Sequence, residues 1–140
     1  MAAGDSFVPS SADVDEILAW FTRYDALAVA KDFEGMADQA MFPVNEVTDG
    51  QAESCDRATF IAQMTAEMGG AGDIEMDIAM DSVRTPHFIN ENLVFVITDA
   101  TITAGGYSRQ VRYGDLLVRC ADGWKFQTMV QGGGAENSTD

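Results

Sequence analysis

Apolar residues in the first half of the chain recur every three or four positions, which is the spacing of amphipathic helices. The longest run predicts a helix with Asp13 as its N-cap, and its apolar stripe comprises Val14, Ile17, Leu18, Phe21 and Leu27. Asp32 and Asp56 are placed to cap two further helices. Pro43 ends the second helix and begins an extended stretch over 44–48. The first half is thus predicted to hold three helices and one extended segment.

The spacing changes to alternation in the second half, which indicates β-strands. Alternating residues begin at Asp73 and lose phase near 81–83, where we expect a bulge or a sharp bend. A turn at 90–92 and the strong hairpin signal Asp122-Gly123 separate the strands that follow, which are predicted over 93–103, 107–120 and 124–131. Helices first and consecutive antiparallel strands afterwards predict an α+β fold with its helices on one face of the sheet.

The last two predicted strands carry apolar residues on both faces. In the final strand, Trp124, Phe126 and Val130 alternate onto one face, while Met129 lies on the other. A single layer of helices covers only one face of a sheet, so the other needs a different partner. We therefore expect a homodimer formed through the outer face of the sheet.

Length, charge and cysteine content narrow the class of protein. The 140 residues are expected to form one domain over 13–131, between a leader at 1–12 and a glycine-rich acidic tail at 132–140. A net charge of −15 disfavours binding to nucleic acids and to anionic membranes. The absence of a signal-peptide pattern or a long apolar run, together with the isolated Cys55 and Cys120, predicts a cytoplasmic protein with reduced thiols.

Three stretches carry a resemblance to a known superfamily. They read RYDAL at 23–27 with KDF at 31–33, FPV at 42–44 through DG at 49–50, and YGDLLVR at 113–119 followed by DGWKF at 122–126. Together they resemble the nuclear transport factor 2-like (NTF2-like) superfamily, which includes ketosteroid isomerases and SnoaL-like polyketide cyclases. The resemblance implies a cone, in which a strongly curved antiparallel sheet wraps around a long N-terminal helix, with three helices in all. It also implies a pocket at the open end for a small, largely apolar ligand.

Tyr24 and Asp115 match two site residues of the ketosteroid isomerases. In those enzymes a helix tyrosine and a protonated aspartic acid donate hydrogen bonds to a developing enolate oxygen. Because Tyr113, Asp115 and Leu117 alternate onto one strand face, Asp115 is expected to point inward among apolar neighbours, where burial raises its pKa. The alternative is that Tyr24 lies at a rim and that Asp115 pairs with Arg112 or with a backbone amide.

The sequence departs from the isomerase pattern at the catalytic base. Counting from Tyr24 without gaps places Thr48 where those enzymes carry a carboxylate, and Glu46 shares its strand face. Glu46 is therefore the predicted substitute base, although a register error of one residue would reverse this assignment. The apolar wall of the pocket is expected to comprise Trp20, Phe42, Phe60, Met64 and Tyr113, with Thr48 also in contact with the ligand.

The remaining candidate groups point to no metal or cofactor. His87 is the only histidine, and its place after Pro86 near a strand end favours a surface role over acid–base chemistry. With no second His or Cys beside it, we expect neither a metal site nor a cofactor. Two hypotheses stay open. One is a cofactor-free, isomerase- or cyclase-like enzyme that moves protons on a small carbonyl compound; the other is a non-catalytic binding or interaction module of the same fold.

Overall fold

The N-cap of the first helix lies three residues before the predicted one. The computed structural model describes residues 7–66, 78–104 and 106–132, in which α1 spans Ser11–Val29. Its N-cap is Ser10, whose Oγ accepts from the backbone N–H of Asp13 at 3.2 Å, while the Asp13 carboxylate accepts from the Ser10 N–H at 2.9 Å. Asp13 is thus the third residue of a capping box, and its prediction as the cap is wrong because Ser10 supplies the same chemistry one turn earlier.

The two short helices begin as predicted. Asp32 caps α2 (Phe33–Asp38) by accepting from the Gly35 N–H at 2.9 Å. Asp56 caps α3 (Arg57–Met64) by accepting from the Thr59 N–H at 2.8 Å. Both carboxylates satisfy backbone donors that a helix leaves free at its first turn, which is why short polar residues mark these boundaries.

Six strands form one sheet in the spatial order β2-β1-β6-β5-β4-β3. They are β1 (Ala40–Thr48), β2 (Gln51–Cys55), β3 (Ile78–Asn90), β4 (Leu93–Ala104), β5 (Tyr107–Cys120) and β6 (Gly123–Gln131). Every neighbouring pair is antiparallel except β1 and β6, which run parallel, so the sheet is mixed. The predicted α+β class with three helices is confirmed. The hydrophobic pattern missed β2, because four of its five residues are exposed.

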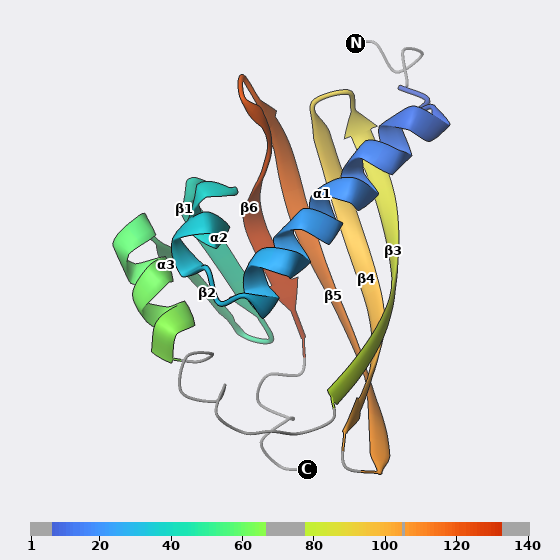
Figure 1. The fold of residues 1–140 in the computed structure, drawn as a ribbon. Coiled ribbons are helices and arrows are strands. Elements are labelled where there is room, and N and C mark those ends of the chain that lie inside the picture. Colours follow the sequence, from blue (N-terminus) through green and yellow to red (C-terminus); the bar gives the residue numbers. More distant parts are fainter. Residues whose placement is uncertain (1–6, 67–77, 105, 133–140) are drawn as a thin grey trace.

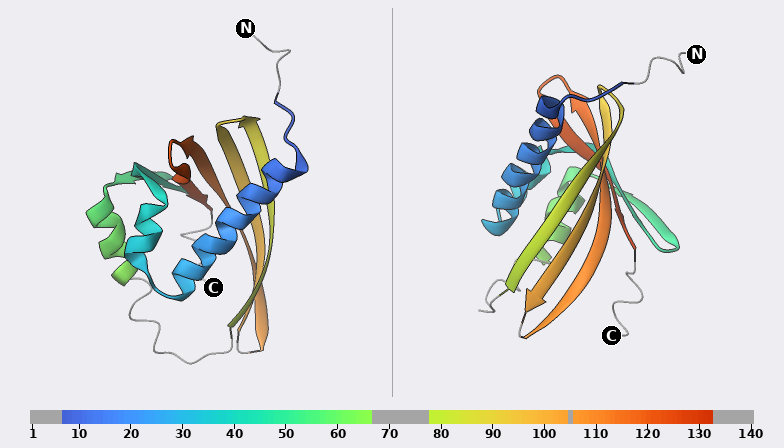
Figure 2. Two further views of the ribbon diagram at one scale, coloured as in Figure 1. Left: turned by 45° about the horizontal axis from the view of Figure 1, so that its top comes forward. Right: turned by 90° about the vertical axis from the view of Figure 1, so that its right-hand side faces the viewer.

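All three helices lie on the same side of the sheet. Figure 1 shows α1 crossing the face formed by β3 to β6, while α2 and α3 lie over the end of the sheet that holds β1 and β2. Figure 2 shows the long strands β3, β4 and β5 twisting and bending along their length beside α1. We call the face toward α1 the inner face and the opposite face the outer face. The helices of the described ranges are too short or too polar to span a lipid bilayer.

The core fills the space between α1 and the inner face. Large side chains of the helices and alternate residues of the strands form one buried cluster, which includes Ile17, Trp20, Phe21, Met36, Val44, Phe60, Val94, Val96, Leu117, Trp124 and Phe126. The alternation predicted for β4 and β5 is therefore the one that places their apolar residues against α1.

The irregularities of the ladder do not fall where the sequence predicted one. The pairing of β3 with β4 is continuous from Ile78 to Phe88, so the expected bulge at 81–83 is wrong, and residues 73–77 lie outside the described part of the chain. A shift does occur between β5 and β6, where Gln127 is the extra residue. This bulge places Met129 on the inner face together with Phe126, although simple alternation predicted opposite faces.

Candidate functional site

A pocket lies between the second half of α1 and the inner face of the sheet. Its volume is about 190 Å³, and among the described residues its lining comprises Trp20, Phe21, Tyr24, Asp25, Arg84, Tyr113, Gly114, Asp115, Phe126, Met129, Val130 and Gln131. The bulge at Gln127 contributes directly, because it turns Met129 toward this cavity. Aromatic walls with a few polar groups are typical of sites for small organic ligands.

The Tyr24 ring is held between two other aromatic rings. It stacks on Trp20 with 5.3 Å between ring centroids and 7° between planes, and the edge of Phe126 meets it at 5.4 Å. Trp20 is itself fixed, because its indole Nε1–H donates to the backbone oxygen of Trp124 at 2.9 Å. These contacts fix the position of the Tyr24 ring at the pocket wall.

Asp115 is a buried carboxyl group in an apolar setting. Its side chain lies on the inner face of β5, and the residue is 9% exposed. Burial raises the pKa of Asp115 to about 7; the nearby charge of Arg84 lowers this pKa, and that of Asp25 raises it further. Among the described residues, none forms a hydrogen bond with this carboxyl or with the Tyr24 hydroxyl. Burial, and next the charge of Asp115, raise the pKa of Tyr24.

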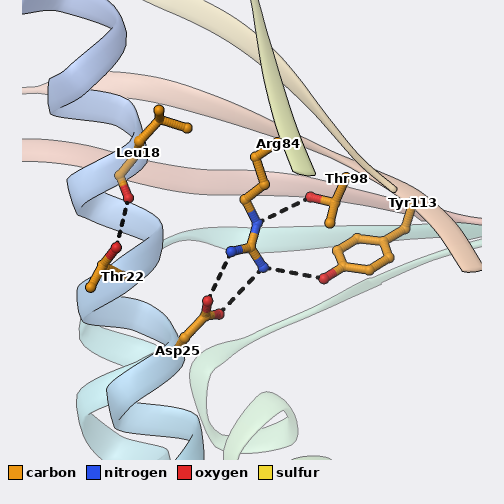
Figure 3. Close-up of polar contacts among 6 residues, drawn as sticks. All are labelled: Leu18, Thr22, Asp25, Arg84, Thr98 and Tyr113. Atoms are coloured by element: carbon orange, nitrogen blue, oxygen red, sulfur yellow. Dashed lines mark hydrogen bonds and ion pairs between the residues drawn. The ribbon is translucent and has the colours of Figure 1, made fainter. Parts of the chain in front are cut away.

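Arg84 joins α1 to three strands beside the pocket. Its Nη1 donates to Asp25 of α1 at 2.8 Å, and its Nε donates to the hydroxyl of Thr98 on β4 at 3.2 Å (Figure 3). Its Nη2 donates to Asp25 at 3.4 Å and to the hydroxyl of Tyr113 on β5 at 3.3 Å. The guanidinium also lies over the Phe21 ring, 4.5 Å from its centroid. We call these four residues, Asp25, Arg84, Thr98 and Tyr113, the arginine clasp.

The pKa of Arg84 reflects this setting. Burial alone would lower it, but the hydrogen bonds to Asp25 and Tyr113 and the charge of Asp25 raise it overall. The Arg84 side chain is 11% exposed, while that of Asp25 is 44% exposed. The clasp therefore keeps a charged guanidinium in the pocket wall, while its partner carboxylate is more exposed to solvent.

No protein-family model matches the sequence, and no curated protein matches it. Among solved structures, Aln2 from a Streptomyces species is 18% identical with a TM-score of 0.70, over 88% of this chain and 91% of Aln2. An NTF2-like protein with a cystatin-like fold from Novosphingobium aromaticivorans is 18% identical with a TM-score of 0.66, over 86% and 81% of the two chains. A candidate dehydratase of the NTF2-like family from Streptomyces avermitilis is 14% identical with a TM-score of 0.68, over 89% and 97%.

This chain has the NTF2-like fold. The fold that the sequence resemblance implied is therefore confirmed. At such low identities the likeness establishes the fold, and the chemistry has to be argued from the residues of the pocket.

Four of the residues predicted for the site of this NTF2-like fold do meet at the pocket. Trp20, Tyr24, Tyr113 and Asp115 all line it. The predicted alternative of an ion pair between Asp115 and Arg112 is wrong, because Arg112 lies on the outer face with its Nε 3.5 Å from Asp99. Alternation along β5 explains the difference, since residues an odd number apart face opposite sides of a sheet.

The other predicted residues are not among those that line the pocket. Phe42 and Phe60 pack against each other, with 5.9 Å between ring centroids, and belong to the core beside α3 together with Met64. Thr48 lies at the turn end of β1, paired with Gln51 of β2.

Glu46 stands one strand away from the pocket wall. It shares its strand face with the buried Val44, and its partner across the parallel ladder is Met129 of β6, which does line the cavity. The sequence could not place Glu46 correctly, because nothing in it indicated that β1 pairs with β6 in parallel.

Arg84 and Asp25 were missed by the sequence argument. The available signal was that Arg84, Pro86 and Phe88 alternate onto one face of β3, which makes Arg84 a lone basic residue on an otherwise apolar stripe. Across the described ranges, no three His, Cys, Asp or Glu side chains come together in a way that could hold a metal ion. His87 is exposed, and alternation places it on the outer face, away from the pocket.

Proposed function

We propose that this protein binds a small, largely apolar carbonyl compound and moves a proton at the carbon next to the carbonyl group, without a cofactor. The observation that carries this proposal is Asp115, a buried carboxyl group whose pKa is raised to about 7, beside Tyr24 in an aromatic pocket. A general acid–base is most effective when its pKa lies near the working pH, because both of its protonation states are then populated. Proton transfer near neutral pH is therefore the chemistry that the pocket favours.

The volume of the pocket limits the size of the ligand. A cavity of about 150 Å³ in another protein holds benzene. At about 190 Å³, this pocket accommodates one substituted ring, and a second ring would extend toward the opening. The stacked Trp20 and Tyr24 rings and the edge of Phe126 offer flat surfaces for such a ring.

The proton transfer proceeds in two balanced steps. The carboxylate of Asp115 takes the proton from the α-carbon, so that the C–H bond breaks and its electron pair forms the carbon–carbon double bond of an enolate. The Tyr24 hydroxyl donates a hydrogen bond to the enolate oxygen, where the negative charge develops. Where the ligand carries a carbon–carbon double bond β,γ to the carbonyl group, the enolate is a conjugated dienolate, and the protonated Asp115 returns the proton to its γ-carbon, which completes an isomerisation. If the enolate instead expels a β-hydroxyl group, which leaves as water with the proton held by Asp115, the reaction is a dehydration, the class named for one NTF2-like neighbour.

In this proposal Asp115, and not Glu46, is the catalytic base. The sequence alone assigns Asp115 a donor role and Glu46 the proton transfer, but Glu46 does not line the pocket. Asp115→Asn separates the two assignments, because an asparagine can donate a hydrogen bond and cannot shuttle a proton. Loss of activity in Asp115→Asn with retention in Glu46→Gln supports Asp115 as the base. The reverse pattern restores the assignment to Glu46.

Exchange of α-protons tests the proposal without knowledge of the natural substrate. Cyclohexanone, cyclohex-2-enone and 2-tetralone are incubated with the protein in D₂O, and loss of the α-proton NMR signals is followed against buffer alone. We expect accelerated exchange for at least one ketone, with an apparent pKa near 7 in its pH profile, and a loss of at least 100-fold in Asp115→Asn. Binding of these ketones without exchange would contradict the catalytic proposal.

A non-catalytic role is the second candidate, and one observation favours it. Of the two carboxyl groups on the described wall, Asp25 is engaged by Arg84, so only Asp115 is available for acid–base work. A protein that only binds its ligand needs no more than this. Ligand-induced NMR shifts at the Trp20 indole with no proton exchange would support binding alone.

We also propose that two copies associate through the outer face of the sheet, with no nucleic acid or membrane involved. On that face the Phe95 ring covers Gly114 so closely that a Cβ at Gly114 would lie 2.4 Å from it, and Val83 and Ile89 are largely exposed. Sedimentation equilibrium of the intact chain tests this: a dimer that Val83→Asp dissociates is expected, and a monomer at every concentration would contradict it.

A further inference from the structure

The hydroxyl oxygen of Tyr113 is already engaged by the arginine clasp. Arg84 Nη2 donates to it at 3.3 Å, and the guanidinium is in turn fixed by Asp25 on α1 and Thr98 on β4 (Figure 3). Three different elements thus hold Arg84 in place, so the lone pair that Tyr113 presents to it is fixed as well.

The hydroxyl hydrogen of Tyr113 cannot be taken up by the same partner. A guanidinium carries five donors and no acceptor, so the contact with Arg84 runs in one direction only. None of the described residues accepts a hydrogen bond from Tyr113, yet Tyr113 lines the pocket. The clasp therefore leaves this donor available to a molecule in the cavity.

The pocket consequently offers donors at two separate places. Tyr113 and Asp115 are two residues apart on the inner face of β5, a spacing of roughly 6.5 Å along a strand. Tyr24 faces them from α1, and all three residues line the same cavity. One oxygen of a ligand can accept from Tyr24, with its α-carbon at Asp115, while a second oxygen on the same ring accepts from Tyr113.

We infer that Tyr113 is a specificity-determining hydrogen-bond donor, positioned by Arg84, that recognises a second oxygen on the ligand. The preferred ligand is then a ring compound that carries a second oxygen besides the one at Tyr24. This inference rests on the proposed function, since it assumes that the first oxygen lies at Tyr24. A donor that a bound ligand covers without pairing it disfavours a ligand lacking the second oxygen, which is how such a group produces selectivity.

Two phenols of nearly equal shape test the inference. Resorcinol carries hydroxyl groups in a 1,3 relation, and 3-methylphenol replaces one of them with a methyl group; both resemble the enol form of a cyclic ketone. Their dissociation constants are measured with the intact chain by NMR titration, following the indole N–H of Trp20, which lines the pocket. The quantity of interest is the ratio of the two constants, because overall damage to the pocket weakens both ligands and leaves this ratio unchanged.

Tyr113→Phe should lower the preference for resorcinol over 3-methylphenol by about three- to tenfold, the effect of one hydrogen bond. Tyr24→Phe is the matched control, since it removes a hydroxyl group at the first oxygen and should weaken both ligands together. Arg84→Lys should reduce the preference in the same direction as Tyr113→Phe, because an ammonium group cannot reproduce the fork that holds Asp25 and Tyr113 together. Should Arg84→Lys fail to fold, Tyr113→Phe alone decides.

The outcomes separate this inference from the function on which it rests. If both phenols bind and Tyr113→Phe leaves the ratio unchanged, Tyr113 is not a specificity donor, while the binding pocket stands. If neither phenol shifts the Trp20 signal at millimolar concentration, both the inference and the proposed pocket are overturned.

Discussion

Leu117 and Asp115 lie two residues apart on the inner face of β5, yet they belong to different regions of the molecule. Leu117 is fully buried in a packed end, defined by Ile17, Val94, Leu117 and Trp124. Asp115 belongs to a polar end, which comprises Asp115, Tyr24 and the arginine clasp, where α1 and the sheet enclose a pocket. The strand β5 thus contributes to the packed core at Leu117 and to the pocket at Asp115, two residues away.

The difference shows how one helix and one sheet serve two purposes. At the packed end, apolar side chains exclude water and hold the two layers together. At the polar end, the layers are joined by hydrogen bonds from Arg84, which leaves room between them and keeps Asp115 in an apolar setting. The packed end supplies stability, and the polar end accepts a buried carboxyl group that costs stability at neutral pH.

Leu117→Ala should produce the largest loss of stability. Leu117 has no exposed surface and sits in the main cluster of the core, so its truncation leaves a cavity. The free energy of unfolding is expected to fall by about 2 to 5 kcal/mol in urea denaturation. A loss below about 1 kcal/mol would show that the packed end is loosely filled and would remove the contrast with the polar end.

At neutral pH, the effect of Asp115→Asn on the free energy of unfolding should be opposite in sign to that of Leu117→Ala. The pKa of Asp115 is raised from 3.8 to about 7, so between these values the folded state binds more protons than the unfolded state. Its contribution is therefore most favourable at low pH and is lost as pH rises through 7, at most about 4 kcal/mol from a shift of about three pKa units. We expect the stability of Asp115→Asn relative to the unsubstituted protein to increase from pH 4 to pH 7 and then level off in urea titrations. A difference that does not vary with pH would contradict this.

A pair of isosteric substitutions on β4 should sharpen the boundary between the two ends. Thr98 and Val96 are both fully buried, two residues apart, and only Thr98 has a polar partner, the Nε of Arg84. Thr98→Val leaves that donor unpaired, and Val96→Thr buries a hydroxyl group without a partner, so each should cost about 1 to 3 kcal/mol in thermal or urea unfolding. If neither substitution lowers the free energy of unfolding, the arginine clasp does not define the polar end.

Arg57→Ala should have the smallest effect and serves as a control outside both ends. Its ion pair with Asp38 spans 2.8 Å, but both side chains are strongly exposed. Exposed pairs of this kind contribute little, and the change in unfolding free energy should stay within about 0.5 kcal/mol. A change above 1 kcal/mol would show that surface charges in this acidic protein matter more than the two ends described above.

Most of the fold could be predicted from local patterns. The caps at Asp32 and Asp56, the strands after residue 90 and the hairpin at Asp122-Gly123 all follow from side chains that act on their own neighbours in the chain. The N-cap at Ser10 was missed because two capping residues stand within one turn of each other. The strand β2 was missed because its exposed residues carry no hydrophobic alternation.

The candidate site was only half predictable, and the reason is long-range pairing. Tyr24, Tyr113 and Asp115 were found because each faces inward on an element whose periodicity is clear. The place of Glu46 depends on the parallel pairing of β1 with β6, and that of Met129 depends on the bulge at Gln127, neither of which leaves a local signal. The arginine clasp draws on four elements, so only the assembled fold reveals it.

The pKa of Asp115 itself is the most direct measurement. With ¹³C-labelled aspartate, the side-chain carboxyl resonance that disappears in Asp115→Asn identifies the group, and its chemical shift is followed from pH 3 to pH 9. A midpoint near pH 7 is the result expected for a buried proton shuttle in an aromatic pocket. A midpoint below about pH 5, within the ordinary range of exposed aspartates, would contradict the proposed role of this residue.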